Sequence, residues 1–578
     1  MPLETLVNEL SHADIDRILT ASGGLYELES AIVAKTSVRT YRRAAPHMRA
    51  LLDRGRQWGE RELVVTASRR VTFEQHYTAV AALAELLVAR HGVAHRDRIA
   101  IAMSNTPEWS IAFWAIVSIG AIVVPLNAWW TGKELSFAVA DAQCKLVIVD
   151  EVRSARLQPF REELKGAAFL RVGTASGNEV GKPEDFVLNA EALWATRSPR
   201  FPDRRIDSDD PATIFYTSGT TGKPRGAINT HRAISSFVLN ATFARARAAL
   251  TAGYCVEQAM QMSSRPTVTL VTTPFFHLIG CYGGLVLAQF LGGKMVLMSR
   301  WDPVSGLELI ERERVTNLSG VPTVVQQTID EAKVSNRDLS SLQAIAYSGA
   351  AAPKWLTTAI ADVLPGRTCG TAYGLTEASG LVASVWGRDY IERPESVGRP
   401  LPTVDVAVHD ERGHAVPVGE IGEIAVRSVG ALSGYWNNED ATDAAIKDGW
   451  LLTGDLGRLD GDGFLFVVDR KKDVIIRGGE NIYSLEVENA LHSHPDIHEA
   501  AVIGLSDRAL GEVVVAIVFC SVAAGLTSEL IRAHVATQLA AYKVPSHVVI
   551  RHEPLPRNAA GKILKVELRA ELTKARAP

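Results

Sequence analysis

A short segment near the middle of the chain, 215–227 (FYTSGTTGKPRGA), holds three glycines, four Ser/Thr residues and two cations in thirteen positions. It follows a strand-like apolar run and precedes a helix-like stretch, a context in which backbone amides and hydroxyls can converge on an anion. The Walker A pattern is excluded, because only two residues separate Gly219 from Gly222 and because Pro224, after Lys223, has no hydroxyl for Mg²⁺. Composition alone leaves two interpretations, a phosphate-binding loop or a turn-rich surface loop.

Six further segments with chemically useful side chains follow in order along the chain. Three of them contain the charged residues Glu377, Asp455 and Lys562. A carboxylate is a hard ligand for Mg²⁺ and a strong bidentate acceptor, and an ammonium on a flexible stem can stabilise charge that develops in a transition state. The six segments are 274–280 (PFFHLIG), 347–353 (YSGAAAP), 371–377 (TAYGLTE), 449–457 (GWLLTGDLG), 469–482 (DRKKDVIIRGGENI) and 555–565 (LPRNAAGKILK).

Together with the glycine-rich loop, these segments resemble, in the same order, the signature motifs of the adenylate-forming superfamily. That superfamily contains acyl-CoA synthetases, peptide-synthetase adenylation domains and beetle luciferases. One match would be weak, but seven in order over most of the chain are specific. The departures are mild: Arg225 stands where lysine is common, and 350–352 is Ala-rich where glycine is more common. The resemblance implies that a carboxylate attacks the α-phosphate of ATP, giving acyl-AMP and pyrophosphate, and that a thiolate then attacks the acyl carbonyl.

The resemblance also implies the site residues. Lys562 would stabilise the first step, Glu377 would hold Mg²⁺, and His277 would line the acyl pocket and orient the carboxylate. For His277, a core histidine with satisfied hydrogen bonds stays open as a second interpretation. Arg470 would complete the ribose and phosphate contacts, with an interdomain salt bridge as its alternative. The residues implied in ATP binding are Thr217, Ser218, Gly219, Thr220, Thr221, Gly222, Lys223, Gly349, Ala350, Ala351, Tyr373, Gly374, Thr376, Asp455, Arg470 and Lys562.

The segment 469–482 resembles the family's hinge, with Lys472 as the pivot between two half-reactions. In the second of these, flexible glycines would allow a pantetheine arm to approach the backbone closely. The residues implied in coenzyme A binding are Gly478, Gly479, Glu480 and Asn481.

We therefore predict an AMP-forming acyl-CoA synthetase, an acid–thiol ligase that uses ATP, Mg²⁺ and coenzyme A. Two alternatives remain, an acyl-AMP ligase that loads a carrier protein and an ATP-binding protein without turnover. An amino-acid substrate would need a buried carboxylate to pair with its ammonium, and the pocket segments FFHLIGCYGG and YSGAAAP contain none. A fatty, alicyclic, aromatic or steroid-like acid fits better.

Alternating strands and helices position these motifs. Apolar runs at 98–104, 145–150, 212–218, 267–274, 294–299 and 342–349 alternate with helical stretches, which predicts mostly parallel sheets with helices packed outside. After about residue 395, period-two alternation predicts a small antiparallel β subdomain. Beyond Lys472 we expect a compact α+β unit that ends in a polar tail. The fold class is thus α/β, with an AMP-binding N-terminal domain (1–470), a hinge near 470–472 and a smaller mobile C-terminal domain (471–578).

Composition restricts the expected partners and the cellular compartment of the protein. A net charge of −4 over 578 residues gives no reason to expect nucleic acid as a partner, and five scattered cysteines suit a reducing cytoplasm. The uncharged segment 109–131 could span a bilayer, but Gly120 and Pro125 divide it into a buried helix (110–119) and a buried strand (121–127), so no membrane span is expected. The expected partners are a small carboxylic acid, ATP and CoA; peripheral membrane contact and a homodimer are both compatible with the sequence.

Overall fold

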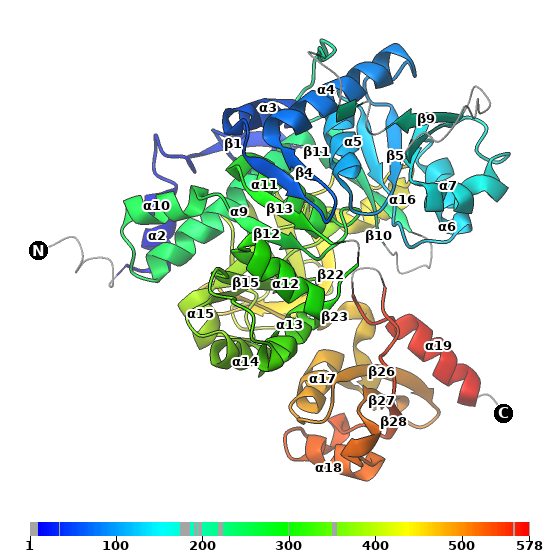
Figure 1. Ribbon diagram of the computed structural model, residues 1–578. Helices are drawn as coiled ribbons and strands as arrows, with labels where there is room; N and C mark the ends of the chain where they lie inside the picture. Colours follow the sequence, from blue (N-terminus) through cyan, green and yellow to red (C-terminus); the bar gives the residue numbers. More distant parts are fainter. Residues whose placement is uncertain are drawn as a thin grey trace, which may run out of the picture.

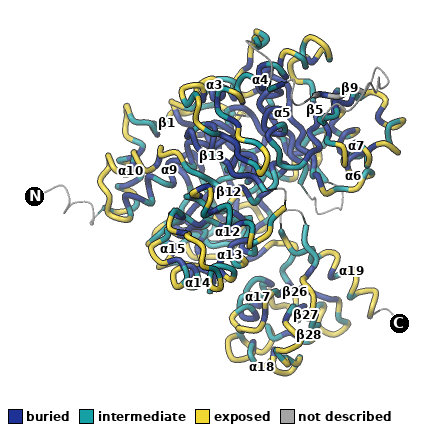
Figure 2. Tube along the Cα trace, in the orientation of Figure 1, coloured by how far each residue is buried: buried dark blue, intermediate teal, exposed yellow. Residues whose placement is uncertain are grey.

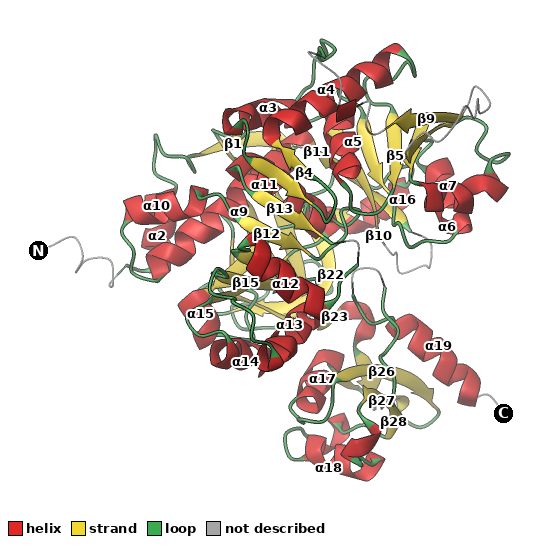
Figure 3. Cartoon of the chain, viewed as in Figure 1, coloured by secondary structure: helices red, strands yellow, loops and turns green. Residues whose placement is uncertain are grey.

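The computed structural model describes residues 10–33, 35–173, 185–189, 193–194, 199–217, 224–298, 300–349, 355–558 and 561–576. Its strands form five sheets, and helices cover the two largest (Figures 1 and 3). The α/β class predicted from alternating strands and helices is confirmed.

The first large sheet has seven strands in the order β11-β10-β6-β5-β7-β8-β9, and all its pairings are parallel except the β10–β11 hairpin. The two strands of this hairpin flank the segment 218–223, which lies outside the described residues. The strands are β5 (Arg98–Ala102), β6 (Ile122–Pro125), β7 (Leu146–Val149), β8 (Ala168–Gly173), β9 (Asp185–Asn189), β10 (Pro211–Thr217) and β11 (Arg225–Thr230).

The uncharged segment 109–131 is a helix followed by a strand of this sheet. Thr106 caps helix α5 (Pro107–Ser118) by accepting a hydrogen bond from the Trp109 amide (3.3 Å), and Pro107 opens it. The chain then turns into β6, which is buried throughout. Among the described residues, no helix is long and apolar enough to cross a membrane.

The second large sheet has nine strands in the order β18-β17-β16-β15-β14-β12-β13-β3-β4. Its six central strands, from β3 to β16, are parallel, and antiparallel strands flank them. The strands are β3 (Glu62–Val65), β4 (Arg70–Thr72), β12 (Val268–Val271), β13 (Lys294–Leu297), β14 (Asn317–Gly320), β15 (Ala344–Ser348), β16 (Thr368–Tyr373), β17 (Ala383–Trp386) and β18 (Arg399–Pro400).

Helix α9 (His231–Thr251) is central to the packing, because its two sides belong to two different hydrophobic cores. The other helices of this region lie around the sheets (Figure 1). They are α2 (His12–Leu19), α3 (Met48–Arg54), α4 (Phe73–Ala89), α6 (Gly132–Asp141), α7 (Glu151–Leu157), α10 (Val256–Ser264), α11 (Leu287–Leu291), α12 (Pro303–Glu313), α13 (Pro322–Val334), α14 (Trp355–Val363), α15 (Gly387–Glu392) and α16 (Glu439–Ala445).

The antiparallel subdomain predicted after residue 395 is a five-stranded sheet. The DGDG segment (460–463) is the turn between its last two strands, β22 and β23. The strands are β19 (Val404–His409), β20 (Gly422–Ser428), β21 (Ile446–Lys447), β22 (Trp450–Leu459) and β23 (Leu465–Arg470); β1 (Leu28–Val33) and β2 (Thr36–Tyr41) form a separate hairpin.

The C-terminal α+β unit has its own sheet and two cores of its own, made of residues from Ile475 onward (Figures 1 and 2). The stretch expected as a polar tail also contains secondary structure: a parallel edge strand and a final helix whose Leu568 is buried. The elements are β24 (Ile475–Arg477), β25 (Glu480–Ile482), α17 (Ser484–His492), β26 (Glu499–Asp507), β27 (Gly511–Phe519), α18 (Ser528–Ala536), β28 (His547–Arg551) and α19 (Lys565–Arg576).

Candidate active site

Glu377 lies in a short 3₁₀ turn (Thr376–Ala378) just beyond β16, and two hydroxyls fix one of its carboxylate oxygens. Its Oε1 accepts hydrogen bonds from the Thr217 hydroxyl (3.1 Å) and the Tyr435 hydroxyl (3.0 Å). Among the described residues, none donates a hydrogen bond to Oε2. Two donors on one oxygen orient the carboxylate and leave the other oxygen available to a ligand.

The turn that carries Glu377 requires glycine at position 374. An ideal Cβ on Gly374 would lie 1.3 Å from the carbonyl oxygen of Gly380, so no other residue fits without moving the backbone. The preceding residue, Tyr373, donates a hydrogen bond from its hydroxyl to Asp455 Oδ2 (2.6 Å). Burial, and then the charge of Asp455, raise the pKa of Tyr373, so its hydroxyl stays a donor.

Asp455 is held from two sides. It lies in β22 opposite Arg470 in β23, and its Oδ1 forms an ion pair with Arg470 Nε at 2.7 Å. The carboxylate is almost completely buried, whereas the guanidinium is about half exposed. The alternative reading of Arg470 as an interdomain salt bridge was wrong, because its partner lies on the neighbouring strand of the same sheet. Tyr373, Asp455 and Arg470 thus form one group, joined by a hydrogen bond and an ion pair.

Lys562 comes from the C-terminal unit to this group. Its backbone closes a small hairpin with Asn558, whose N–H donates to the Lys562 carbonyl (2.8 Å) and whose Oδ1 accepts from the Lys562 amide (3.0 Å). At Gly561 (φ +76°), an ideal Cβ would lie 3.0 Å from Val321, so the hairpin approaches the N-terminal region closely. Lys562 is exposed to solvent.

The electrostatic surroundings of Lys562 are mixed. Desolvation and then the positive charge of Arg470 lower the pKa of Lys562, while Asp455 and Glu377 oppose the shift. Among the described residues, none makes a hydrogen bond or ion pair with Nζ. The structure therefore brings the three charged residues of the sequence motifs to one place, although almost two hundred positions separate Glu377 from Lys562.

His277 has a buried Nε2 with no hydrogen-bond partner among the described residues. Burial, and then the nearby Lys562, lower the pKa of His277 to about 4, so the ring is neutral at pH 7. The expectation of a core histidine with satisfied hydrogen bonds was wrong for this nitrogen. A buried, unpaired ring nitrogen beside Lys562 is available to a ligand.

Both sides of the predicted hinge make polar contacts. Lys472 lies in a 3₁₀ turn (Lys471–Asp473), and its neighbour Lys471 pairs with Glu423 (2.9 Å). Before the turn, the carboxylate of Asp469 accepts hydrogen bonds from the Ser484 amide and hydroxyl, the latter at 3.1 Å. Burial raises the pKa of Asp469, although the charge of Lys565 opposes this effect.

The glycines predicted to bind coenzyme A form the turn between β24 and β25. Gly478 and Gly479 have φ angles of +61° and +89°, which favour glycine. The contacts of this turn are within the C-terminal unit: the Gly478 amide donates to the Leu510 carbonyl (2.7 Å), and Arg477 donates to the Tyr542 carbonyl (2.6 Å). Glu480 and Asn481 lie on β25. Among the described residues, no hydrogen bond or ion pair links these four positions to Glu377 or Lys562.

Part of the predicted ATP site lies outside the described residues. Gly349 (φ +84°) follows β15, and an ideal Cβ there would lie 3.3 Å from Ile279. Thr376 opens the turn that carries Glu377. The positions not described are Ser218, Gly219, Thr220, Thr221, Gly222, Lys223, Ala350 and Ala351.

Sequence reasoning missed Tyr435, which holds Glu377 from a loop after β20. The only local signal is an aromatic residue after Gly434 in a polar loop (433–440, SGYWNNED), which by itself does not suggest a contact with Glu377.

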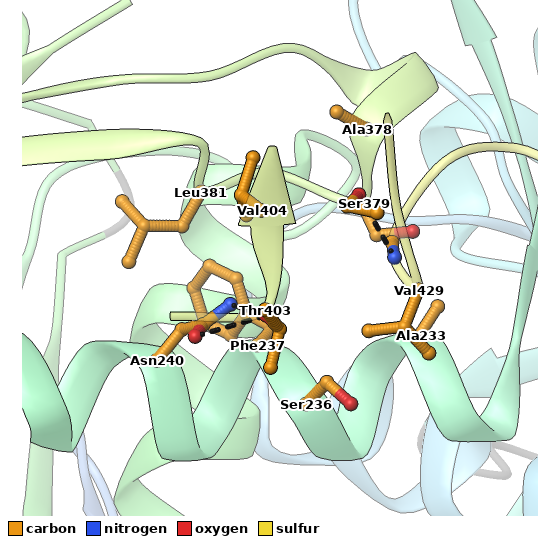
Figure 4. Close-up of a pocket in the computed structure, with 12 residues that line it drawn as sticks. Ala233, Ser236, Phe237, Asn240, Ala378, Ser379, Leu381, Thr403, Val404 and Val429 are labelled. Atoms are coloured by element: carbon orange, nitrogen blue, oxygen red, sulfur yellow. Dashed lines mark hydrogen bonds between the residues drawn. The ribbon is translucent and has the colours of Figure 1, made fainter. Parts of the chain in front are cut away.

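A small cavity lies next to the Glu377 turn, between α9 and the antiparallel sheet (Figure 4). Much of its polar lining is satisfied internally. Asn240 Nδ2 donates to Thr403 Oγ1 (2.9 Å), and Asn240 Oδ1 accepts from the Tyr41 hydroxyl (2.7 Å). We therefore attribute this cavity to the packing of α9. Phe237, which lines the cavity, lies near Leu278, the neighbour of His277, because both side chains are close to Gly380.

Comparison with known proteins identifies the family. The AMP-binding enzyme family matches residues 51–436, and the AMP-binding enzyme C-terminal domain matches residues 486–562. The chain therefore belongs to the AMP-binding enzyme family. This membership supports adenylate formation as its chemistry. The resemblance noted in the sequence is confirmed.

Two curated relatives and one solved structure illustrate the similarity. The chain is 30% identical to a long-chain-fatty-acid–CoA ligase of Bacillus subtilis, over 90% of this chain and 94% of the relative. It is 33% identical to an indoleacetate–CoA ligase of Aromatoleum aromaticum, over 87% and 94%. The structure of the amide bond synthetase McbA from Marinactinospora thermotolerans superposes with a TM-score of 0.79 at 28% identity, covering 91% of this chain and 99% of that one.

Proposed function

We propose that this chain is an ATP-dependent acyl-CoA synthetase that converts a carboxylic acid, ATP and CoA into acyl-CoA, AMP and pyrophosphate through an acyl-adenylate. The observation that carries the proposal is the convergence of Lys562 on Glu377 and Asp455. One ammonium facing two fixed carboxylates is suited to a reaction in which negative charge accumulates and must be positioned and neutralised.

Each residue has a role that follows from its surroundings. Asp455, held by Tyr373 and Arg470, keeps acceptor capacity for the ribose hydroxyls. Lys562 binds the carboxylate and the α-phosphate oxygens as the former attacks the latter, and pyrophosphate leaves. The neutral ring of His277 orients the acid in the pocket, since its buried Nε2 has no hydrogen-bond partner among the described residues.

The donor set at Glu377 fits Mg²⁺. Oε2 is a hard oxygen that receives no hydrogen bond from the described residues, and the fixed Oε1 holds it in place. Mg²⁺ held there would neutralise phosphate charge. Thr217 and Tyr435 position the carboxylate for it.

The second half-reaction needs a thiol. We infer that rotation about Lys472, between the domains 1–470 and 471–578, removes Lys562 and presents Gly478–Asn481 to the pantetheine arm. Both curated relatives described above are named as CoA ligases, which supports CoA as the acceptor. The similarity to an amide bond synthetase keeps an amine as a second candidate acceptor for the same adenylate.

A direct assay tests the proposal. Purified enzyme is incubated with ATP, Mg²⁺, CoA and a panel of fatty, aromatic and alicyclic acids, and AMP and thioester are measured together. We expect equal amounts of both with at least one acid, and neither with Lys562→Ala. Release of AMP without thioester would eliminate CoA as the acceptor, and a repeat of the assay with amines then tests the second candidate.

A further inference from the structure

Helix α9 is almost entirely buried, but one side of it is half open. Phe237, Ala241, Arg245 and Ala248 are each partly exposed, whereas the residues between them are buried. Their spacing of four, four and three residues places them on one side of the helix. A half-open stripe on an interior helix indicates a groove along it.

A second half-open surface faces this stripe from the π-helix (Ile279–Val286) and α11. Ile279, Gly283 and Phe290 are partly exposed there. An ideal Cβ on Gly283 would meet no atom within 4 Å, so space is open beside it. The rings of Phe237 and Tyr282 lie 5.7 Å apart, which shows that the two elements are neighbours (Figure 1).

One end of this groove lies at the proposed catalytic residues. An ideal Cβ on Gly380, in the turn after Glu377, would lie 3.0 Å from the Phe237 ring and 2.5 Å from Leu278, the neighbour of His277. Arg245 lies eight residues further along α9. At 1.5 Å per residue, this is about 12 Å from Phe237 along the helix axis.

Arg245 carries a guanidinium without a counter-ion. Among the described residues, none forms a hydrogen bond, ion pair or ring contact with it. Burial lowers the pKa of Arg245 to about 10, against a weak opposing effect of Tyr26. By contrast, Arg247, two residues along the same helix, pairs with Asp16 at 2.8 Å and is 7% exposed. Arg245 is partly exposed on the open side of α9, so its guanidinium is available to pair with an oxygen acceptor of a ligand.

We propose that Arg245 recognises an oxygen acceptor, a carboxylate or a carbonyl, at the distal end of the acid substrate. The inference rests on the proposed function and narrows its substrate class. The acid is extended, with its reacting carboxylate near His277 and Lys562 and its acceptor oxygen within reach of the Arg245 side chain, whose backbone lies about 12 Å from Phe237 along the helix axis. A purely hydrocarbon tail would leave the guanidinium desolvated and unpaired.

Three acids of equal chain length test this proposal: dodecanoate, dodecanedioate and the monomethyl ester of dodecanedioate. We expect the wild-type enzyme to prefer the two acids with a distal oxygen. In Arg245→Met, the ratio of kcat/KM for dodecanedioate to that for dodecanoate should fall about 10- to 100-fold, the effect of losing a hydrogen bond to a charged group. If kcat/KM relative to dodecanoate falls in Arg245→Met for the diacid alone, the acceptor is a carboxylate. If it falls for the monomethyl ester as well, a neutral oxygen is sufficient.

Arg247→Met is the matched control, a buried arginine on the same helix that is ion-paired. It should lower the melting temperature and leave the ratio unchanged, whereas Arg245→Met should not lower the melting temperature, because it removes an unpaired charge. The thermal shift caused by each acid reports recognition without turnover. An unchanged ratio and equal thermal shifts in Arg245→Met overturn the inference. Absence of AMP and thioester with every acid, with the differences in thermal shift retained, contradicts only the proposed function.

Discussion

The two carboxylates of the candidate site and the lysine that faces them are held by different means. Glu377 follows β16 of the nine-stranded sheet and accepts two side-chain hydrogen bonds. Asp455 lies within β22 of the five-stranded sheet, accepts a hydrogen bond from Tyr373 and forms an ion pair with Arg470. Lys562 lies in a short hairpin that is closed by backbone and Asn558 contacts. Among the described residues, none fixes its ammonium. The carboxylate side of the candidate site is therefore held in place by side-chain contacts, and we propose that the cation is delivered to it by movement of the C-terminal unit.

The segment that joins the N-terminal region to the C-terminal unit is also held by only a few side-chain contacts. The buried Asp469–Ser484 hydrogen bonds connect the end of β23 to the start of α17, across the predicted pivot Lys472. Lys565, three residues after Lys562, forms a 2.7 Å ion pair with Glu488 and donates to Ser484. A few polar contacts thus stabilise the position of Lys562 in this structure, and the proposed rotation about Lys472 would have to exchange them. If the carboxylates stay in place and Lys562 moves, substitution of Lys562 should affect only the first half-reaction. Substitution of a carboxylate should affect both half-reactions.

The largest expected effect follows from removing the delivered cation. In Lys562→Ala, single-turnover acyl-AMP formation should fall about 100- to 1,000-fold, as when one transition-state donor is lost. Thioester formation from supplied acyl-AMP should stay within about tenfold of wild type, because the ammonium acts only in the first step. Quenched-flow measurement of both steps checks this. Equal losses in both would contradict the idea of a delivered cation.

Removal of a fixed carboxylate should act on both steps. In Asp455→Asn, the charge that Arg470 and the ribose site depend on is lost, so we expect a loss of about 10- to 100-fold in kcat/KM for ATP and in the thioester step from acyl-AMP. Asp462→Asn, an exposed carboxylate in the turn of the same hairpin, is the control and should match wild type. A loss confined to adenylation would show that Asp455 is not part of a shared nucleotide site.

The sequence predicted the strands and the chemical residues better than the contacts between them. Apolar, β-branched runs located strands such as β5 and β7, because burial on both faces leaves a continuous apolar pattern. The strand β28 (HVVIR) was missed although it contains three consecutive β-branched residues, because the run is too short to show a period. The helix α19 was missed because charged residues dominate it.

The sequence revealed the charged residues of the site because they lie in specific motifs. It did not reveal the residues that contact them. Tyr435 lies 58 positions from Glu377, and Arg245 is one of several arginines in an alanine-rich helix. No local pattern distinguishes the paired Arg247 from the unpaired Arg245. Only the fold shows which of them has a counter-ion.

The acidity of Lys562 gives a pH-dependent difference between the two steps. Its ammonium form is the active one, and its pKa is lowered by burial and by Arg470. Acyl-AMP formation should therefore fall on the alkaline side at a pH below the usual lysine value, by about tenfold per pH unit above the pKa. The thioester step should lack this limb. In Lys562→Arg the limb should disappear, since a guanidinium stays protonated; persistence of the limb would assign it to another group.

The smallest expected effect concerns the hydroxyl that orients Glu377. Tyr435→Phe removes one of two donors to Oε1 and keeps the ring, so we expect the apparent affinity for Mg²⁺ to fall about three- to tenfold, the effect of one neutral hydrogen bond. Direct titration with Mn²⁺ in the presence of ATP, followed by electron paramagnetic resonance, measures this without turnover. Thr217→Val, which removes the second donor, should have a similar effect, and the double variant should lose more than either, because Glu377 is then free to rotate. Tyr254→Phe, which removes an exposed hydroxyl outside the site, is the control. If Tyr435→Phe weakens Mn²⁺ binding no more than this control, the Tyr435 hydroxyl does not position the Glu377 carboxylate. The position of Glu377 then depends on the Thr376–Ala378 turn alone.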